Sequence, residues 1–233
     1  MNQPLIWIDG IIGVGKSTAV TKLGQSLNFQ VFPEPVNEDL LKIYYEDQSR
    51  WGFAFQVDML NQRFSLYLEA IRQISNGYGV IMDRCLPGDR VFAKMLHNTG
   101  KIHDIEWMIY ENSYNSFIKT LPPPNLLIFL ETSPINAFRR IEKRAREAED
   151  PNLLPLEYLK KLYQEYHKFL DQILSGDHPW SLKMEVWILD WNKDWIPLDS
   201  IVNDIQELFP HSKKLKQPFA PHSKQSIVSH LSS

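Results

Sequence analysis

An eight-residue segment near the start of the chain has the composition and spacing of an anion-binding loop. It consists of Gly10, Ile11, Ile12, Gly13, Val14, Gly15, Lys16 and Ser17, which fits the pattern of glycine, four residues, then Gly-Lys-Ser. Glycines allow successive backbone N–H groups to face one anion, and a helix that begins there adds the positive end of its dipole. The run 4–9 before the loop is typical of a buried strand, and 15–26 has helical spacing. This context predicts a nucleoside triphosphate site, in which we include Thr18.

Two further charged segments follow predicted strands. Glu34 stands between two prolines after the run 30–32, and Asp83 and Arg84 follow the run 79–82. The carboxyl ends of parallel strands share one edge of a sheet, where α/β proteins bind ligands. Either segment alone is explained by surface charge. The presence of both segments in a chain that also has a phosphate loop favours a phosphoryl-transfer site. We expect Glu34 to act as a base, Asp83 to lie near a metal ion and Arg84 to contact the transferring phosphate.

A third charged segment is unusually rich in arginine, with four arginines between residues 139 and 146. A charged helix is most often a solvated face. Beside a triphosphate site it has a second interpretation, because phosphoryl transfer depends on positioning and on cations around the spreading charge. We therefore predict a mobile arginine lid.

Strands and helices alternate along the chain and must position these segments. The alternation predicts a three-layer α/β domain with a parallel sheet over residues 1–209, followed by a flexible tail over 210–233. The predicted strands are 4–9, 30–32, 79–82, 125–130 and 185–189. The predicted helices are 15–26, 51–75, 104–120, 134–148, 155–174 and 197–208.

Composition limits the classes of partner. The chain of 233 residues carries a net charge of −3, which gives no reason to expect a nucleic-acid polymer. Its apolar runs stay below the roughly 18 residues that suggest a membrane span, and we see no secretory signal. One cysteine excludes an internal disulfide framework and suits a reducing compartment. We expect a cytoplasmic protein that binds no membrane.

The order of the motifs resembles the deoxynucleoside kinase family. The resemblance rests on GIIGVGKS at 10–17, PEPV at 33–36, WGFAFQ at 51–56, MDR at 82–84 and RRIEKRAREAE at 139–149. It implies a P-loop kinase fold, with a five-stranded parallel sheet flanked by helices and an arginine-rich lid. It also implies transfer of the γ-phosphate of ATP, with Mg²⁺, to the 5′-hydroxyl of a deoxynucleoside in nucleotide salvage. Family members are usually homodimers, and 105–110 resembles part of their interface helices.

The resemblance implies roles for residues at matching positions. Glu34 matches the base for the 5′-hydroxyl, and Arg84 matches an arginine of the catalytic motif. Lys16 and Ser17 match the phosphate and magnesium ligands of the loop. The other matches are Tyr45 and Glu149 for the sugar 3′-hydroxyl, Phe55 and Gln56 for the base, Arg140, Arg144 and Arg146 for the lid, and Asp194 and Trp195 for the ATP adenine.

The predicted helix 51–75 carries two polar residues on its apolar face. At about 100° per residue, Gln56 and Arg63 fall in the middle of the face that includes Met59, which we also assign to the substrate site. A buried amide and guanidinium without partners would be costly, so both need polar groups nearby. A structural partner inside the core would serve, and so would the edge of a nucleobase.

Base selectivity is predicted from Arg63 and Asp89. In deoxycytidine and deoxyguanosine kinases the matching positions hold an arginine and an aspartate, whereas thymidine-accepting relatives have smaller or apolar residues there. Asp89 would neutralise Arg63 and accept a hydrogen bond from an exocyclic amino group, but it would face a carbonyl acceptor on thymine. We predict deoxycytidine or a purine deoxynucleoside as substrate, with thymidine poor.

Two other functions remain open at this point. A nucleoside monophosphate kinase that resembles thymidylate kinase also has a phosphate loop and an Asp-Arg pair, but the predicted base and sugar contacts favour the nucleoside kinase. A non-catalytic kinase-like subunit predicts loss of Lys16, Glu34 or Arg84, and all three are present.

Overall fold

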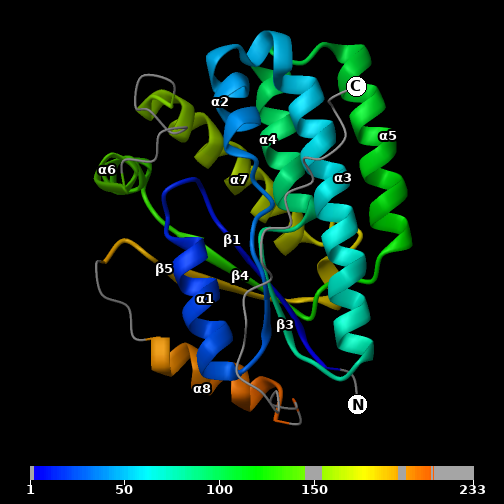
Figure 1. Cartoon of the computed structure of the whole chain (residues 1–233), viewed down its shortest axis with the longest axis vertical. Coiled ribbons are helices and arrows are strands. Elements are labelled where there is room, and N and C mark those ends of the chain that lie inside the picture. Colours follow the sequence, from blue (N-terminus) through cyan, green and yellow to red (C-terminus); the bar gives the residue numbers. More distant parts are fainter. Residues whose placement is uncertain (1–2, 145–153, 194–197, 211, 213–233) are drawn as a thin grey trace, which may run out of the picture.

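A parallel sheet forms the centre of the molecule. The computed structural model describes residues 3–144, 154–193, 198–210 and 212. Within these ranges, five parallel strands lie in the order β2-β3-β1-β4-β5 (Figure 1), which confirms the predicted fold class. The strands are β1 (Leu5–Asp9), β2 (Gln30–Phe32), β3 (Val80–Asp83), β4 (Leu126–Glu131) and β5 (Glu185–Asp190).

Helices cover both faces of the sheet. Helices α1 and α8 lie on one face, and α3, α4, α5 and α7 lie on the other (Figure 1). The helices are α1 (Lys16–Leu27), α2 (Glu38–Glu46), α3 (Gln48–Ser75), α4 (Leu86–Asn98), α5 (Asp104–Thr120), α6 (Pro134–Arg144), α7 (Leu156–Ser175) and α8 (Leu198–Leu208). None of the helices in the described part of the chain has both the length and the apolar character that a membrane span requires.

The central strand β1 is buried along its whole length, because both of its faces are covered. Ile6 and Ile8 belong to the core on the side of α1 and α8, whereas Leu5 and Trp7 belong to the core on the opposite side. Successive side chains of a strand point to opposite faces, so an unbroken apolar run satisfies both layers at once.

The strand register brings three predicted segments, namely the phosphate loop and the segments that contain Glu34 and Arg84, to one edge of the sheet. Ile8 of β1 pairs with Asp83 of β3, and Phe32 of β2 pairs with Met82 of β3. The phosphate loop, the segment with Glu34 and the segment with Arg84 therefore leave the sheet side by side.

Two helices were not predicted from the sequence. Helix α2 was missed because it is short. Its N-cap Asn37, whose side chain accepts a hydrogen bond from the N–H of Leu40 at 3.1 Å, was a signal in the sequence that could have indicated it. Helix α4 begins with Leu-Pro-Gly, which reads as a turn, but a proline in the first helical turn loses no helical hydrogen bond. The predicted tail 210–233 lies outside the described residues except for Pro210 and Ser212.

Two helical glycines provide a matched test of how tightly helices pack. A Cβ added at Gly24 in α1 would lie 2.2 Å from Val31 Cγ2, whereas one at Gly52 in α3 would have Leu96 Cδ1 as its nearest neighbour, at 3.5 Å. We expect Gly24→Ala to lower the free energy of unfolding by about 1–3 kcal/mol through overpacking. Gly52→Ala should raise it by about 0.5–1 kcal/mol through helix propensity. Urea denaturation measures both, and equal effects would contradict this account of the α1–β2 contact.

Candidate active site

The phosphate loop joins β1 to α1 with a backbone that suits glycine. Gly13 and Gly15 have φ angles of 81° and 98°, where other residue types are strained. A Cβ at Gly13 would also lie 2.5 Å from the carbonyl oxygen of Ala137 in α6. Glycine is therefore required at these two positions by the path of the chain and, at Gly13, by the close approach of α6.

Lys16 is the first residue of α1, and its ammonium group lies inside the loop. Nζ donates hydrogen bonds to the carbonyl oxygens of Gly10 and Ile11, at 3.1 and 2.9 Å. Burial and the charge of Arg84 lower the pKa of Lys16 to about 8, although nearby carboxylates act in the opposite direction. A phosphate in the loop would favour the charged ammonium.

Ser17 and Asp83 connect α1 to the end of β3. Ser17 Oγ donates a hydrogen bond to Asp83 Oδ2 at 2.7 Å, and Asp83 Oδ1 is buried with no hydrogen-bond partner among the described residues. Burial and the charge of Glu34 raise the pKa of Asp83, although Lys16 opposes the shift. A hydroxyl and a carboxylate supply the oxygen ligands that Mg²⁺ prefers.

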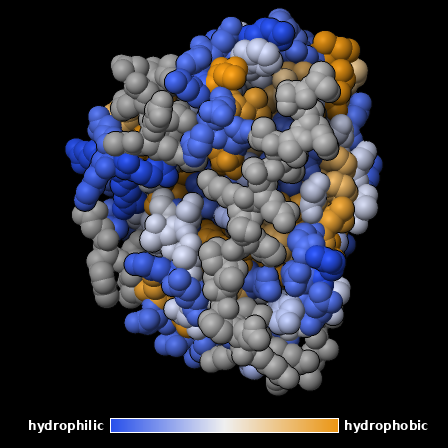
Figure 2. Space-filling view, in the orientation of Figure 1, coloured by the Kyte–Doolittle hydropathy of each residue, from blue (hydrophilic) through white to orange (hydrophobic). Residues whose placement is uncertain are grey.

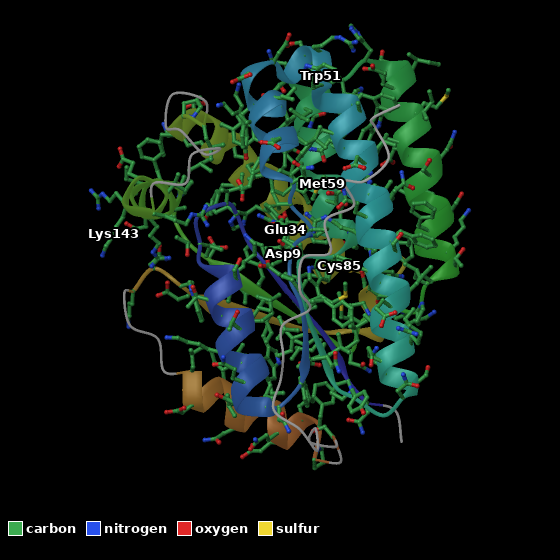
Figure 3. The ribbon with its side chains drawn as sticks, in the orientation of Figure 1. Asp9, Glu34, Trp51, Met59, Cys85 and Lys143 are labelled. Atoms are coloured by element: carbon green, nitrogen blue, oxygen red, sulfur yellow. The ribbon has the colours of Figure 1, made fainter. Side chains whose placement is uncertain are left out.

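Glu34 is the shared partner of two buried arginines. Its Oε1 lies 2.6 Å from Arg63 Nη2 and 3.0 Å from Arg84 Nε. Burial raises the pKa of Glu34, but the charges of Arg84, Arg63 and Lys16 outweigh this effect and lower it to about 2. The side chain is about a quarter exposed, so an ionised carboxylate faces the cavity at the edge of the sheet. Figure 3 shows Glu34 at the centre of the molecule.

Arg84 is held by residues that sequence reasoning missed. Its φ of 67° lies in the left-handed region, which is uncommon for a residue other than glycine and marks a backbone fixed by its surroundings. Nη1 donates to Asp9 Oδ1 at 2.9 Å and also to the hydroxyl of Tyr166. Asp9 stands next to the phosphate loop in the sequence, but Tyr166 lies 157 residues further on, so no local pattern connects the two.

A cavity of about 250 Å³ joins the phosphate loop to the face of α3. Every predicted substrate residue that the structure describes lines it: Glu34, Tyr45, Phe55, Gln56, Met59, Arg63, Arg84 and Asp89. The loop residues that line it are Ile12, Gly13, Gly15, Lys16, Ser17 and Thr18, and helix α6 contributes Arg140 and Arg144. Gly10, Ile11 and Val14 are buried and line no part of this cavity, and Asp83 is connected to it through Ser17.

The far end of the cavity carries the predicted pair of Arg63 and Asp89. Arg63 Nε donates to Asp89 Oδ1 at 3.0 Å, and the hydroxyl of Tyr110 donates to Asp89 Oδ2 at 2.8 Å. Two buried atoms at this end have no hydrogen-bond partner among the described residues, the acceptor Gln56 Oε1 and the donor Arg63 Nη1. Arg63 also contacts Glu34, and this contact was not predicted from the sequence.

An aromatic wall supports the same end of the cavity. The rings of Tyr44 and Phe55 stack with centroids 4.3 Å apart and planes 11° apart, so one face of Phe55 is covered by protein. The hydroxyl of Tyr44 lies 3.1 Å from that of Tyr158 and also hydrogen bonds to Gln56. Neither Tyr44 nor Tyr158 was predicted, because their contact joins elements that lie 114 residues apart in the sequence.

Helix α6 is tied to the loop and to the segment that follows β5. Arg140 Nη1 donates to the carbonyl oxygen of Val14 at 3.2 Å, and its Nη2 donates to those of Trp191 and Lys193 at 3.0 and 3.2 Å. Arg144 is the last described residue of α6. The predicted site residues Arg146, Glu149, Asp194 and Trp195 lie outside the described residues.

Comparisons with known proteins agree with this geometry. The family model described as deoxynucleoside kinase matches residues 6–214. A deoxyadenosine kinase of Dictyostelium discoideum is 37% identical over 169 residues, which are 72% of this chain and 67% of that protein. A deoxyguanosine kinase of the same organism is 32% identical over 203 residues, or 86% of this chain and 68% of that protein.

A solved structure agrees as well. The deoxyadenosine kinase from M. mycoides with bound dATP has a TM-score of 0.70 and 26% identity, and the match covers 89% of this chain and all of that one. The two chains therefore share one overall fold. Because the family model spans nearly the whole chain and two relatives exceed 30% identity, this chain belongs to the deoxynucleoside kinase family of phosphotransferases.

Proposed function

We propose that this enzyme transfers the γ-phosphate of ATP to the 5′-hydroxyl of a deoxynucleoside, and that it favours deoxycytidine or a purine deoxynucleoside over thymidine. The observation that carries the proposal is one cavity that holds Glu34 and Arg84 beside the phosphate loop and is also lined by Gln56, while Arg63 reaches from Glu34 to Asp89. A phosphate donor and a base-bearing acceptor would then meet at Glu34. The single, buried cysteine and the class of substrate support a cytoplasmic role in salvage.

The donor triphosphate is assigned to the loop and the lid. Backbone N–H groups at the start of α1 and the ammonium of Lys16 would bind its phosphates. Arg140 and Arg144 line the cavity from α6 and would add positive charge around the transferring group. By similarity, Arg146 belongs to the same lid, and Asp194 and Trp195 enclose the adenine.

Magnesium is assigned to Ser17 and Asp83. Asp83 Oδ1, which is buried and has no hydrogen-bond partner in the described part of the chain, and the hydroxyl of Ser17 fit a hard cation beside the phosphate loop. When bound, Mg²⁺ neutralises charge on the phosphates and helps to orient them. Asp83 needs such a neighbour, because burial otherwise disfavours its ionised form.

Glu34 would orient the 5′-hydroxyl and take its proton. The new bond joins the 5′-oxygen to the γ-phosphorus, and the bond between that phosphorus and the β–γ bridging oxygen breaks. A carboxylate with a pKa of about 2 is a weak base, so proton transfer to Glu34 would follow most of the bond formation. Orientation is then the larger part of its contribution. Arg84 would neutralise charge on the transferring group.

The sugar and the base are assigned to the rest of the cavity. Tyr45 lines it and, with Glu149, would hold the 3′-hydroxyl, while Phe55 and Met59 would contact the base. Gln56 Oε1 requires a donor and Arg63 Nη1 requires an acceptor, which adjacent groups on a base edge supply. Asp89 adds an acceptor that suits an exocyclic amino group. The names of the relatives and the dATP and dCTP bound to the solved kinase support this choice.

A homodimer is proposed through α5. Ile105, Met108 and Ile109 follow helical spacing and are about half exposed or more, and hydrophobic residues gather at the edge of the molecule where α5 lies (Figures 1 and 2). A contiguous apolar surface of this kind is typical of an association site.

The role of Glu34 is tested by Glu34→Gln, which keeps the shape and removes the charge. The kcat should fall by about two to four orders of magnitude while ATP affinity changes little. Because the pKa of Glu34 is about 2, the carboxylate is ionised throughout the range above pH 5, and the wild-type kcat/KM should show no acid limb from it there. The exposed Glu46→Gln serves as the control, and a Glu34→Gln enzyme with near-normal kcat contradicts the assignment.

Base selectivity is tested by combining Arg63→Met with Asp89→Ala. The ratio of kcat/KM for thymidine to that for deoxycytidine should rise by about tenfold to a hundredfold, because the acceptor that faces the thymine carbonyl is removed. Both absolute values should fall, since Arg63 also contacts Glu34. Arg90→Met removes a neighbouring arginine that pairs with Glu111 and should leave the ratio unchanged. A wild-type preference for thymidine would overturn the selectivity proposal.

The dimer is tested by placing a charge on α5. Ile109→Glu should convert the wild-type dimer into a monomer by light scattering, because a buried carboxylate without a partner opposes association. Leu182→Glu alters a side chain that is 91% exposed elsewhere and should keep the wild-type mass. A monomeric wild-type protein, or a dimeric Ile109→Glu variant, would contradict the assigned surface.

A further inference from the structure

A fully buried carboxylate at the end of β1 takes no part in the steps proposed above. Asp9 Oδ1 accepts hydrogen bonds from the backbone N–H of Gly10 at 2.7 Å, from Arg84 Nη1 at 2.9 Å and from the hydroxyl of Tyr166 at 2.8 Å. Its Oδ2 accepts one from Trp7 Nε1 at 3.0 Å. Four donors thus hold a single carboxylate in one orientation, which is more than charge compensation alone requires.

Packing fixes the same carboxylate from the opposite side. A Cβ added at Gly88, in the first turn of α4, would lie 1.9 Å from Asp9 Oδ2. The absence of a side chain at Gly88 therefore makes room for the carboxylate between β1 and α4. Asp9 lies close to Glu34 in the view of Figure 3, and Arg84 joins the two, because Nη1 contacts Asp9 and Nε lies 3.0 Å from Glu34 Oε1.

The side-chain hydrogen bonds of Arg84 within the described residues all involve one nitrogen of its guanidinium, Nη1. Nη1 donates to Asp9, to Tyr166 and to the carbonyl oxygen of Gly10. The ring of Phe92 lies against the guanidinium, with its centroid 4.7 Å from Cζ. In the described part of the chain, no hydrogen bond of Arg84 involves Nη2. Because a guanidinium is planar and rigid, holding Nη1 and one face determines where Nη2 points.

Asp9 also affects how the charge of Glu34 is shared between Arg63 and Arg84. A buried arginine requires a carboxylate, and Glu34 is already the partner of Arg63 at 2.6 Å. With Asp9 present, Arg84 has a counterion of its own behind the loop. Glu34 is then not the only anion that holds Arg84, and its remaining hydrogen-bonding capacity stays directed to the cavity.

We propose that Asp9, supported by Tyr166 and by the space at Gly88, is a positioning residue that fixes Arg84 so that Nη2 is presented to the transferring phosphate. This inference rests on the proposed phosphoryl transfer at Glu34. Asp9 itself contacts neither substrate nor donor. Its effect passes through the orientation of one guanidinium.

The direct test measures kcat and both KM values for Asp9→Asn, Gly88→Ala and Tyr166→Phe. Misplacing a catalytic group by about 1 Å costs up to a hundredfold, so Asp9→Asn should lower kcat by about 10–100-fold with the KM for the deoxynucleoside changed less than about threefold. Gly88→Ala, which displaces the carboxylate without removing it, should show the same split. Tyr166→Phe should lower kcat by about three- to tenfold.

A double-mutant cycle separates positioning from a structural role. In an Arg84→Ala background, Asp9→Asn and Tyr166→Phe should each produce no further loss of kcat, because the group that they orient is gone. A purely structural role predicts the same loss in both backgrounds and overturns the proposal, as does a wild-type kcat for Asp9→Asn. If the Asp9→Asn variant does not fold, the cycle of Tyr166→Phe with Arg84→Ala decides between a positioning role and a structural role.

Failure of the proposed function is distinguishable in the same assay. A wild-type enzyme without activity on any deoxynucleoside would remove the proposed function itself. Normal wild-type activity, impaired Glu34→Gln and unimpaired Asp9→Asn would remove only the role of Asp9.

Discussion

The site depends on keeping opposite charges together in a region from which water is largely excluded. Arg63, Arg84 and Lys16 are buried at the edge of the sheet, and each would be costly to enclose alone. Asp9, Glu34, Asp83 and Asp89 stand among them, contributed by the ends of β1, β2 and β3 and by the first turn of α4. The strand order and register are thus also conditions for charge balance. A shift of one strand would leave an ion without its partner.

Arg63 links the two ends of the cavity. Through Nη2 it contacts Glu34, where the chemistry is proposed, and through Nε it contacts Asp89, where the base is proposed to lie. In the proposed function, substrate recognition and phosphoryl transfer would therefore share one guanidinium on helix α3. A substitution of Arg63 necessarily alters the surroundings of Glu34, so selectivity and rate would not be independently adjustable at this position.

The sequence predicted those parts of the site that are encoded locally. The phosphate loop, Glu34 and the Asp83–Arg84 segment each follow a strand, and helical spacing alone placed Gln56 and Arg63 on the buried face of α3. The contact between Arg63 and Asp89 was predicted through the family pattern and is present in the structure. Asp9 with Tyr166, and Tyr44 with Tyr158, were missed because their contacts join elements distant in sequence, 157 and 114 residues apart. Helix α4 was missed because its Leu-Pro-Gly start resembles a turn.

Gln56 Oε1 and Arg63 Nη1 have a consequence for the evolution of such a pocket. Two buried polar atoms without hydrogen-bond partners among the described residues make the ligand-free fold less stable than it could be. Substitutions that supply an internal partner would raise stability and at the same time occupy the two atoms that are proposed to bind the base. The stability of the ligand-free fold and the proposed selectivity among bases therefore make opposite demands on these two atoms. A lineage selected only for thermal stability would then be expected to lose the proposed preference among bases before it loses the fold.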